Sequence, residues 1–77
     1  MIEKTIEAFL ASPPERDELV IQLFVKDGGQ WGEIFRDNGQ WRLELYTPVG
    51  GPPWNLDLDE ARKVLDTSLE ELKRRLE

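Results

Sequence analysis

The glutamates at positions 33 and 44 are the side chains best placed for chemistry. They belong to two neighbouring alternating segments, so Glu33 and Glu44 can face each other across a sheet. A carboxylate pair can act as general acid and base. Surface sheets carry such glutamates routinely, however, and no serine or threonine has a histidine to activate it. We therefore expect that the protein is not an enzyme, with an enzyme subunit using Glu33 as the weaker alternative.

The segment 55–66 has the acid spacing of a calcium loop without its other requirements. Asn55, Asp57 and Asp59 alternate, and Asp66 stands at the twelfth position. The sixth position, where a calcium loop needs glycine, is Glu60, and the twelfth is normally a glutamate. A helix start explains the same residues, with Asp57 as the N-cap and Glu60 completing a capping box. We expect no metal site and no cofactor.

Three cations near two aromatic residues suggest single-stranded nucleic acid as a ligand. Lys26, Arg36 and Arg42 accompany Phe24 and Tyr46 in the strand-like middle of the chain. The formal charge of −6 opposes this interpretation, since an acidic protein repels phosphate. A weak nucleic-acid binder therefore remains a minor alternative, and we expect no nucleic-acid partner.

The composition indicates one small acidic domain. The chain has 77 residues, with 16 acidic and 10 basic side chains, and it lacks cysteine and histidine. We treat residues 1–77 as a single domain. Without cysteine or histidine there is no disulfide, no thiolate nucleophile and no zinc site of the usual kind. No run reaches the ~20 apolar residues of a membrane span, so we expect a cytoplasmic protein that contacts no membrane.

The periodicities predict an αβββα order of elements. Apolar residues at helical spacing predict a helix over residues 2–11, which Pro13 and Pro14 end. Residues rich in β-branched and aromatic side chains predict three strands joined by two glycine turns. A long amphipathic repeat predicts a C-terminal helix. The three strands cover residues 18–26, 31–36 and 41–47, and the second helix covers residues 56–77.

This order predicts an α+β fold in which a three-stranded antiparallel meander carries both helices on one face. That face is the one bearing Leu43 and Leu45. The register of the second strand stays open. Two-residue turns would set Ile34 toward the helices and Trp31 away from them. Three-residue turns would bring Trp31 to the helix side, with Glu33 among the apolar residues there.

Either register leaves Phe24 and Tyr46 on the sheet face away from the helices. We therefore expect a contact surface there, and the candidate residues are Phe24, Lys26, Arg42, Tyr46 and Trp54. Trp54 stands in a loop of glycines and prolines, where it plugs the end of the core or, as the second alternative, meets a partner.

The leading hypothesis for function is a small acidic protein that acts by protein–protein contact. It would serve as an adaptor, an inhibitor or an immunity-type partner of a basic protein. The alternative is a homodimer, structural or regulatory, that pairs through the open sheet face. No small-molecule substrate is indicated.

Overall fold

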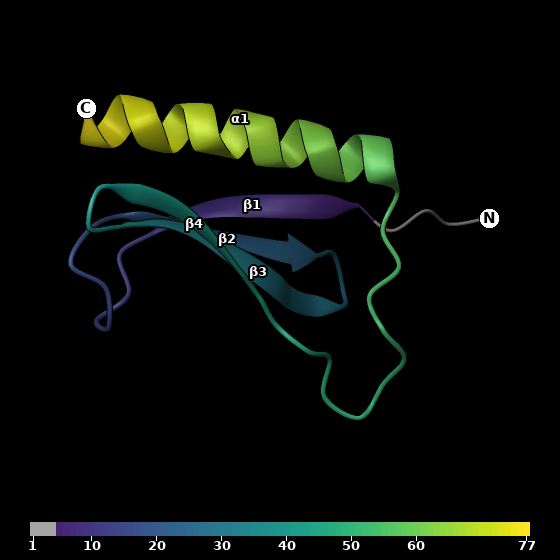
Figure 1. Ribbon diagram of the computed structural model, residues 1–77. Coiled ribbons are helices and arrows are strands. Elements are labelled where there is room, and N and C mark those ends of the chain that lie inside the picture. The colour runs from purple at the N-terminus through teal and green to yellow at the C-terminus, as the bar shows by residue number, and fades with distance from the viewer. Residues whose placement is uncertain (1–4) are drawn as a thin grey trace.

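Residues 5–77 fold into a four-stranded antiparallel sheet that one helix crosses on one face. The computed structural model describes residues 5–77. Each strand pairs with the next, so the sheet order is β1-β2-β3-β4 (Figure 1). The elements are β1 (Ile6–Ala11), β2 (Val20–Val25), β3 (Gly29–Asp37), β4 (Gln40–Leu45) and α1 (Leu58–Leu76). The α+β class agrees with the prediction, whereas the αβββα order is wrong.

The predicted N-terminal helix is a strand. Residues 6–11 form β1, which pairs antiparallel with β2 from Ile6 opposite Val25 to Ala11 opposite Val20. The same six residues also fit a two-residue period, and an isolated helix this short is marginal in water. Pairing with β2 gives the backbone its hydrogen bonds, so the strand prevails. Ile2, which belonged to the predicted helix, lies outside the described residues.

The two hairpin turns have different lengths. Asn38 and Gly39 form a two-residue loop with φ of 52° and 78°, which confirms the second of the two predicted glycine turns, between β3 and β4. The β2–β3 connection takes three residues, 26–28, with Asp27 at φ 62° and Gly29 at φ 113°. Each turn therefore relies on a residue that tolerates a left-handed backbone.

A bulge near the start of β3 changes which side chains share a face. Leu23 lies opposite Gly32, but the next residue of β2, Phe24, lies opposite Gln30. Trp31 is therefore the extra residue, and its side chain is buried in the core under the helix.

Both registers considered from sequence therefore hold only in part. Ile34 faces the helix, as two-residue turns predict, and Trp31 faces it too, as three-residue turns predict. Glu33 and Phe35 lie on the opposite face. Strict alternation cannot place Trp31 and Ile34 together, because their numbers differ in parity.

The helix α1 begins as its sequence predicts. The Asp57 carboxylate accepts a hydrogen bond from the Glu60 N–H at 2.9 Å, the N-cap contact. Glu60 does not return the bond to residue 57 but accepts one from the backbone N–H of Ile6 at 2.8 Å. The carboxylate expected in a capping box thus ties the start of α1 to the start of β1.

The position of α1 leaves part of the sheet uncovered. The core cluster consists of Ile6, Ile21, Leu23, Val25, Trp31, Ile34 and Leu72. The contacts of α1 fall mainly on β1 and β2 (Figure 1). Because a helix is about 10 Å across and strands lie about 4.8 Å apart, one helix covers about half of a four-stranded sheet. The expectation that helices roof Leu43 and Leu45 is therefore wrong: these side chains are 45% and 66% exposed.

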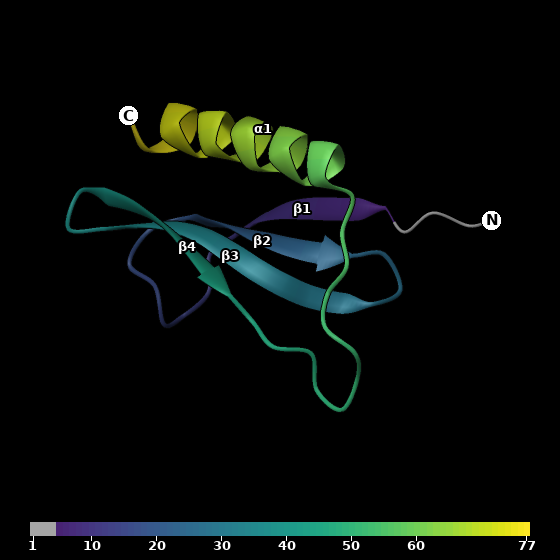
Figure 2. The same ribbon diagram turned by 45° about the vertical axis from the view of Figure 1, so that its right-hand side comes forward.

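The connection between β4 and α1, residues 46–57, extends beyond the strands and returns to the start of the helix (Figure 2). Trp54 lies in this connection and packs against the core cluster. Its indole N–H donates to the Tyr46 carbonyl oxygen at 2.9 Å. This packing is that of the predicted core plug, and the loop backbone accepts the only donor of the ring, although the ring is only partly buried.

Candidate contact surface

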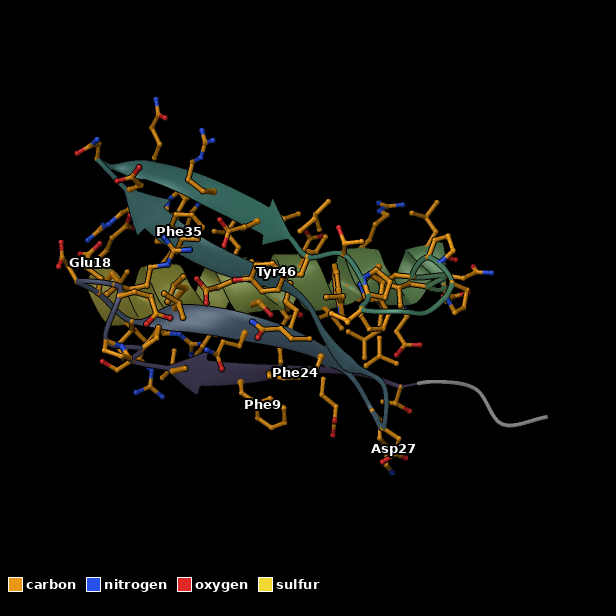
Figure 3. The ribbon with its side chains drawn as sticks, turned by 90° about the horizontal axis from the view of Figure 1, so that it is seen from below. Phe9, Glu18, Phe24, Asp27, Phe35 and Tyr46 are labelled. Atoms are coloured by element: carbon orange, nitrogen blue, oxygen red, sulfur yellow. The ribbon has the colours of Figure 1, made fainter. Side chains whose placement is uncertain are left out.

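The sheet face away from α1 carries a row of aromatic side chains. Phe24 and Tyr46 lie there, as predicted from sequence, together with Phe9 and Phe35 (Figure 3). Phe9 and Phe24 meet edge to face, with ring centroids 5.6 Å apart. Phe9 belongs to β1, which the sequence predicts as a helix, and for this reason the sequence does not place Phe9 on this face.

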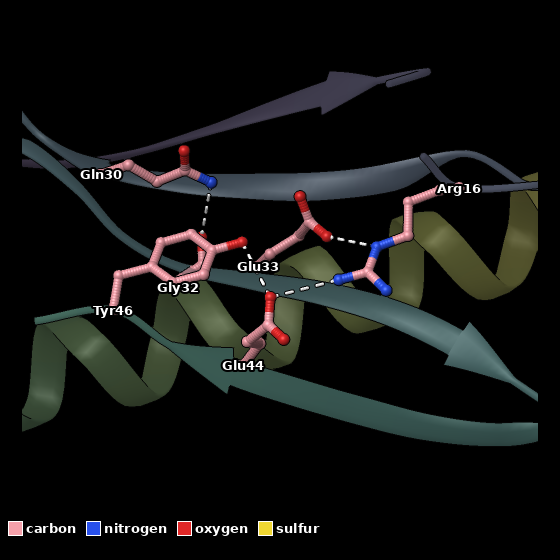
Figure 4. Close-up of polar contacts among 6 residues, drawn as sticks. All are labelled: Arg16, Gln30, Gly32, Glu33, Glu44 and Tyr46. Atoms are coloured by element: carbon pink, nitrogen blue, oxygen red, sulfur yellow. Dashed lines mark hydrogen bonds and ion pairs between the residues drawn. The ribbon is translucent and has the colours of Figure 1, made fainter. Parts of the chain in front are cut away.

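The middle of that face is closed by a side chain from the β1–β2 loop. The Arg16 guanidinium stacks on the Phe35 ring, 3.6 Å from the ring centroid. Its Nε donates to Glu33 at 2.7 Å, and its terminal nitrogen donates to Glu44 at 3.2 Å (Figure 4). The Tyr46 hydroxyl donates to the same Glu44 oxygen at 3.0 Å. We call these four polar residues, Arg16, Glu33, Glu44 and Tyr46, the Arg16 network.

The Arg16 network explains how a carboxylate is buried on this face. Glu33 is only 4% exposed, and an unpaired charge at that depth would be costly. Its hydrogen bond to Arg16 raises the pKa of the guanidinium, so a cation stays beside the carboxylate. Burial, and then the bond to Glu44, raises the pKa of Tyr46 to about 12, so its phenol stays protonated as a donor.

This arrangement holds the β1–β2 loop against the sheet through charged hydrogen bonds. The carboxylate of Glu33, singled out as a candidate general base, accepts a charged hydrogen bond from a loop residue. The network thereby fixes the β1–β2 loop over the sheet. That the protein is not an enzyme remains a prediction, as does the alternative of an enzyme subunit using Glu33.

The five residues of the predicted contact surface differ in their surroundings, and their role in contact remains a prediction. Phe24 is half-buried beside Phe9. Tyr46 and Trp54 are half-buried and donate hydrogen bonds within the molecule. Lys26 and Arg42 are exposed.

The three cations considered for nucleic acid are also separated. Arg36 lies opposite Trp41 in the β3–β4 register, on the helix side of the sheet, with its guanidinium carbon 5.5 Å from the indole ring centroid. It pairs with Glu18, and this contact lowers the pKa of Glu18. The cation cluster that sequence reasoning placed beside Phe24 and Tyr46 therefore loses one of its three members.

Sequence reasoning missed a surface on the other face. Trp41, Leu43 and Leu45 alternate along β4 toward the helix side, and the two leucines stay exposed. We call these three residues the β4 strip. The alternation marked all three as apolar, but only the structure shows that Trp41 packs against the core cluster whereas α1 leaves Leu43 and Leu45 uncovered. The widths of the elements could have indicated this exposure, because a single helix is too narrow to cover the whole sheet.

An apolar cleft adjoins the β4 strip at Leu45. Its volume is about 530 Å³. The lining includes Trp31, Leu45, Pro48, Pro53, Trp54 and Leu56. Within residues 5–77, the buried indole nitrogen of Trp31 has no hydrogen-bond acceptor. The strip and the cleft together form a continuous apolar region that reaches from β4 to the loop before α1.

Comparisons of this chain with family models, with curated proteins and with solved structures find no match. In the part of the chain that the structure describes, no helix is both long and apolar enough to cross a membrane. The same part holds no cluster of three or more His, Cys, Asp or Glu side chains arranged to bind a metal ion.

Proposed function

We propose that this protein acts by protein–protein contact, and that the β4 strip with its adjoining cleft is the contact surface. The observation that carries the proposal is the exposure of Leu43 and Leu45, at 45% and 66%, on a sheet face where α1 contacts mainly β1 and β2. Small monomeric domains seldom leave neighbouring large apolar side chains in water without a use for them.

The net negative charge of the chain favours a basic partner. At −6, the protein attracts basic surfaces and speeds its encounter with them. A basic partner with an apolar centre fits this surface, and the protein serves it as an adaptor, an inhibitor or an immunity-type partner. The lack of cysteine is compatible with the cytoplasm, which we propose as its location.

Site-specific photocrosslinking in the cells that make the protein tests the proposal. A benzophenone amino acid replaces Leu45 in one variant and Asp66, an exposed residue of α1, in the matched control. We expect a discrete adduct with a foreign protein from position 45 and none from position 66. An excess of unmodified protein should suppress that adduct.

The outcome against the proposal is equally definite. If position 45 gives no foreign adduct, or gives the same adducts as position 66, the β4 strip is not a contact surface for another protein.

The alternative of a homodimer through the open sheet face has one observation in its favour. Phe9 is half exposed on that face beside Phe24. Against it stands the Arg16 network, because stacking two such faces would bury two copies of a charged cluster, and desolvating charges costs more than apolar contact returns there.

A further inference from the structure

The two edges of the sheet are protected unequally. The edge at β1 lies against α1, and the backbone N–H of Ile6 already donates to Glu60. The edge at β4 has no neighbouring strand among the described residues, and β4 contains no proline and no register shift against β3. An edge without a neighbouring strand is a template for another strand.

The backbone groups that point outward from β4 can be assigned. The N–H of Tyr46 donates to the Trp31 carbonyl at 3.0 Å, so Tyr46 turns its polar groups toward β3. Antiparallel pairing alternates this direction along the strand. The N–H and C=O groups of Trp41, Leu43 and Leu45 therefore face the free edge.

We propose that a second copy of this chain occupies that edge, with the two β4 strands pairing antiparallel about a twofold axis at Leu43. In this register Leu43 lies opposite its own copy, and Trp41 lies opposite Leu45 of the second copy. All three outward residues then exchange backbone hydrogen bonds, and the two β4 strips lie side by side.

Charge selects this register over its neighbours. With the axis at Leu43, Arg42 lies opposite Glu44 of the second copy, and the pair occurs twice. These are the closely spaced, non-hydrogen-bonded positions, where opposite charges attract most. An axis at Arg42 would oppose two arginines, and an axis at Glu44 would oppose two glutamates.

Both charged groups are available for this pairing. Within residues 5–77, Arg42 has no ion-pair partner, and its side chain is exposed. The two contacts of Glu44 both use Oε1, which leaves Oε2 for the second copy. The segment Trp41-Arg42-Leu43-Glu44-Leu45 is thus complementary to itself in reverse.

The resulting sheet has eight strands, with both α1 helices on one side. The joined β4 strips form an apolar floor between those helices. This inference goes beyond the proposed function, because it assigns the backbone edge of β4, whereas the proposed function assigns its side chains to a foreign partner.

Engineered cysteine crosslinking provides a direct test, because the natural chain has no cysteine. Leu43→Cys places two thiols on strands whose Cα atoms lie about 5.5 Å apart, within disulfide range. We expect mild oxidation of Leu43→Cys to give a disulfide-linked dimer. The control Leu58→Cys, at an exposed leucine on α1, should stay monomeric. Equal crosslinking of both variants, or none of Leu43→Cys, overturns the proposal.

Charge reversal tests the register by sedimentation equilibrium. The Arg42→Glu variant opposes like charges twice, so its dimer should dissociate at least about tenfold more readily than wild type. The control Arg62→Glu makes the same charge change on α1 and should leave the equilibrium unchanged. Equal effects of Arg42→Glu and Arg62→Glu overturn the register.

The two proposals fail separately. If the wild-type chain is monomeric up to about millimolar concentration, the pairing is overturned. The dissociation constant of the dimer would then exceed about 1 mM, and almost no dimer would form at lower concentrations. A foreign adduct at position 45 would still support the proposed function in that case. A dimer without a foreign adduct would support the pairing alone.

Discussion

At the scale of single residues, the Arg16 network shows how one loop side chain decides what a sheet face can hold. Glu33 is a carboxylate at a nearly inaccessible position, and it is tolerated because Arg16 reaches it from the β1–β2 loop. The same guanidinium covers Phe35 and contacts Glu44. A face that would otherwise present aromatic rings to water is therefore partly closed by polar groups.

Tyr46 provides a direct measurement of this environment, since it is the only tyrosine of the chain. Titration of the phenolate absorbance should give a midpoint of about 12 in the folded protein and near 10.0 in concentrated urea. Glu44→Gln should bring the folded midpoint only part of the way toward 10.0, because burial is the larger cause.

The shifted pKa of Tyr46 also gives stability a pH dependence. The folded state keeps the phenolic proton to higher pH than the unfolded state, so the unfolded state binds fewer protons between pH 10 and 12. The free energy of unfolding should therefore fall across that interval, and Tyr46→Phe should lessen the fall. A folded midpoint equal to that in urea would contradict this account of the site.

At the scale of elements, the bulge in β3 decides the composition of the core. It brings Trp31 to the same side as Ile34 and leaves Phe35 on the other. Within β3, Gly32 also lies in close contact with the neighbouring strand.

Gly32→Ala tests that close approach. An added Cβ would lie 3.0 Å from the Glu44 carbonyl oxygen and 3.4 Å from the Leu23 side chain, so the backbone of β4 must move by a few tenths of an ångström. We expect the free energy of unfolding to fall by about 1–3 kcal/mol, measured by urea denaturation.

The matched control for this change is Gly51→Ala, where an added Cβ meets no heavy atom of the described residues within 4 Å. The control should alter stability by less than about 0.5 kcal/mol. Equal stabilities for the two variants would show that β3 and β4 do not approach as described.

At the scale of the whole molecule, stability depends on one helix docking on half of a sheet. Leu72 is fully buried in that contact, at 0% exposure, whereas Leu58 at the first residue of α1 is 73% exposed. The two leucines are chemically identical, and only the docking of α1 distinguishes them.

Leu72→Ala should therefore lower the free energy of unfolding by about 2–5 kcal/mol, enough to populate the unfolded state in a domain this small. Leu58→Ala should change it by no more than about 0.5 kcal/mol. Thermal unfolding followed by circular dichroism compares the two. Similar losses in both variants would mean that α1 does not pack through Leu72.

The sequence alone determined the features that depend on local chemistry. The Asn38-Gly39 turn, the N-cap at Asp57 and the course of α1 follow from residue conformational preferences and helical periodicity. The sequence also determined that Phe24 and Tyr46 point away from the helix, because both registers considered place them on that face.

Tertiary structure decided what depends on partners distant in the chain. Residues 6–11 fit both a helix and a strand, and pairing with β2 made them β1. The bulge at Trp31 and the exposure of Leu43 and Leu45 depend on how one helix and four strands share space. No local sequence pattern determines these features, because the burial of a residue depends on how all the elements pack together.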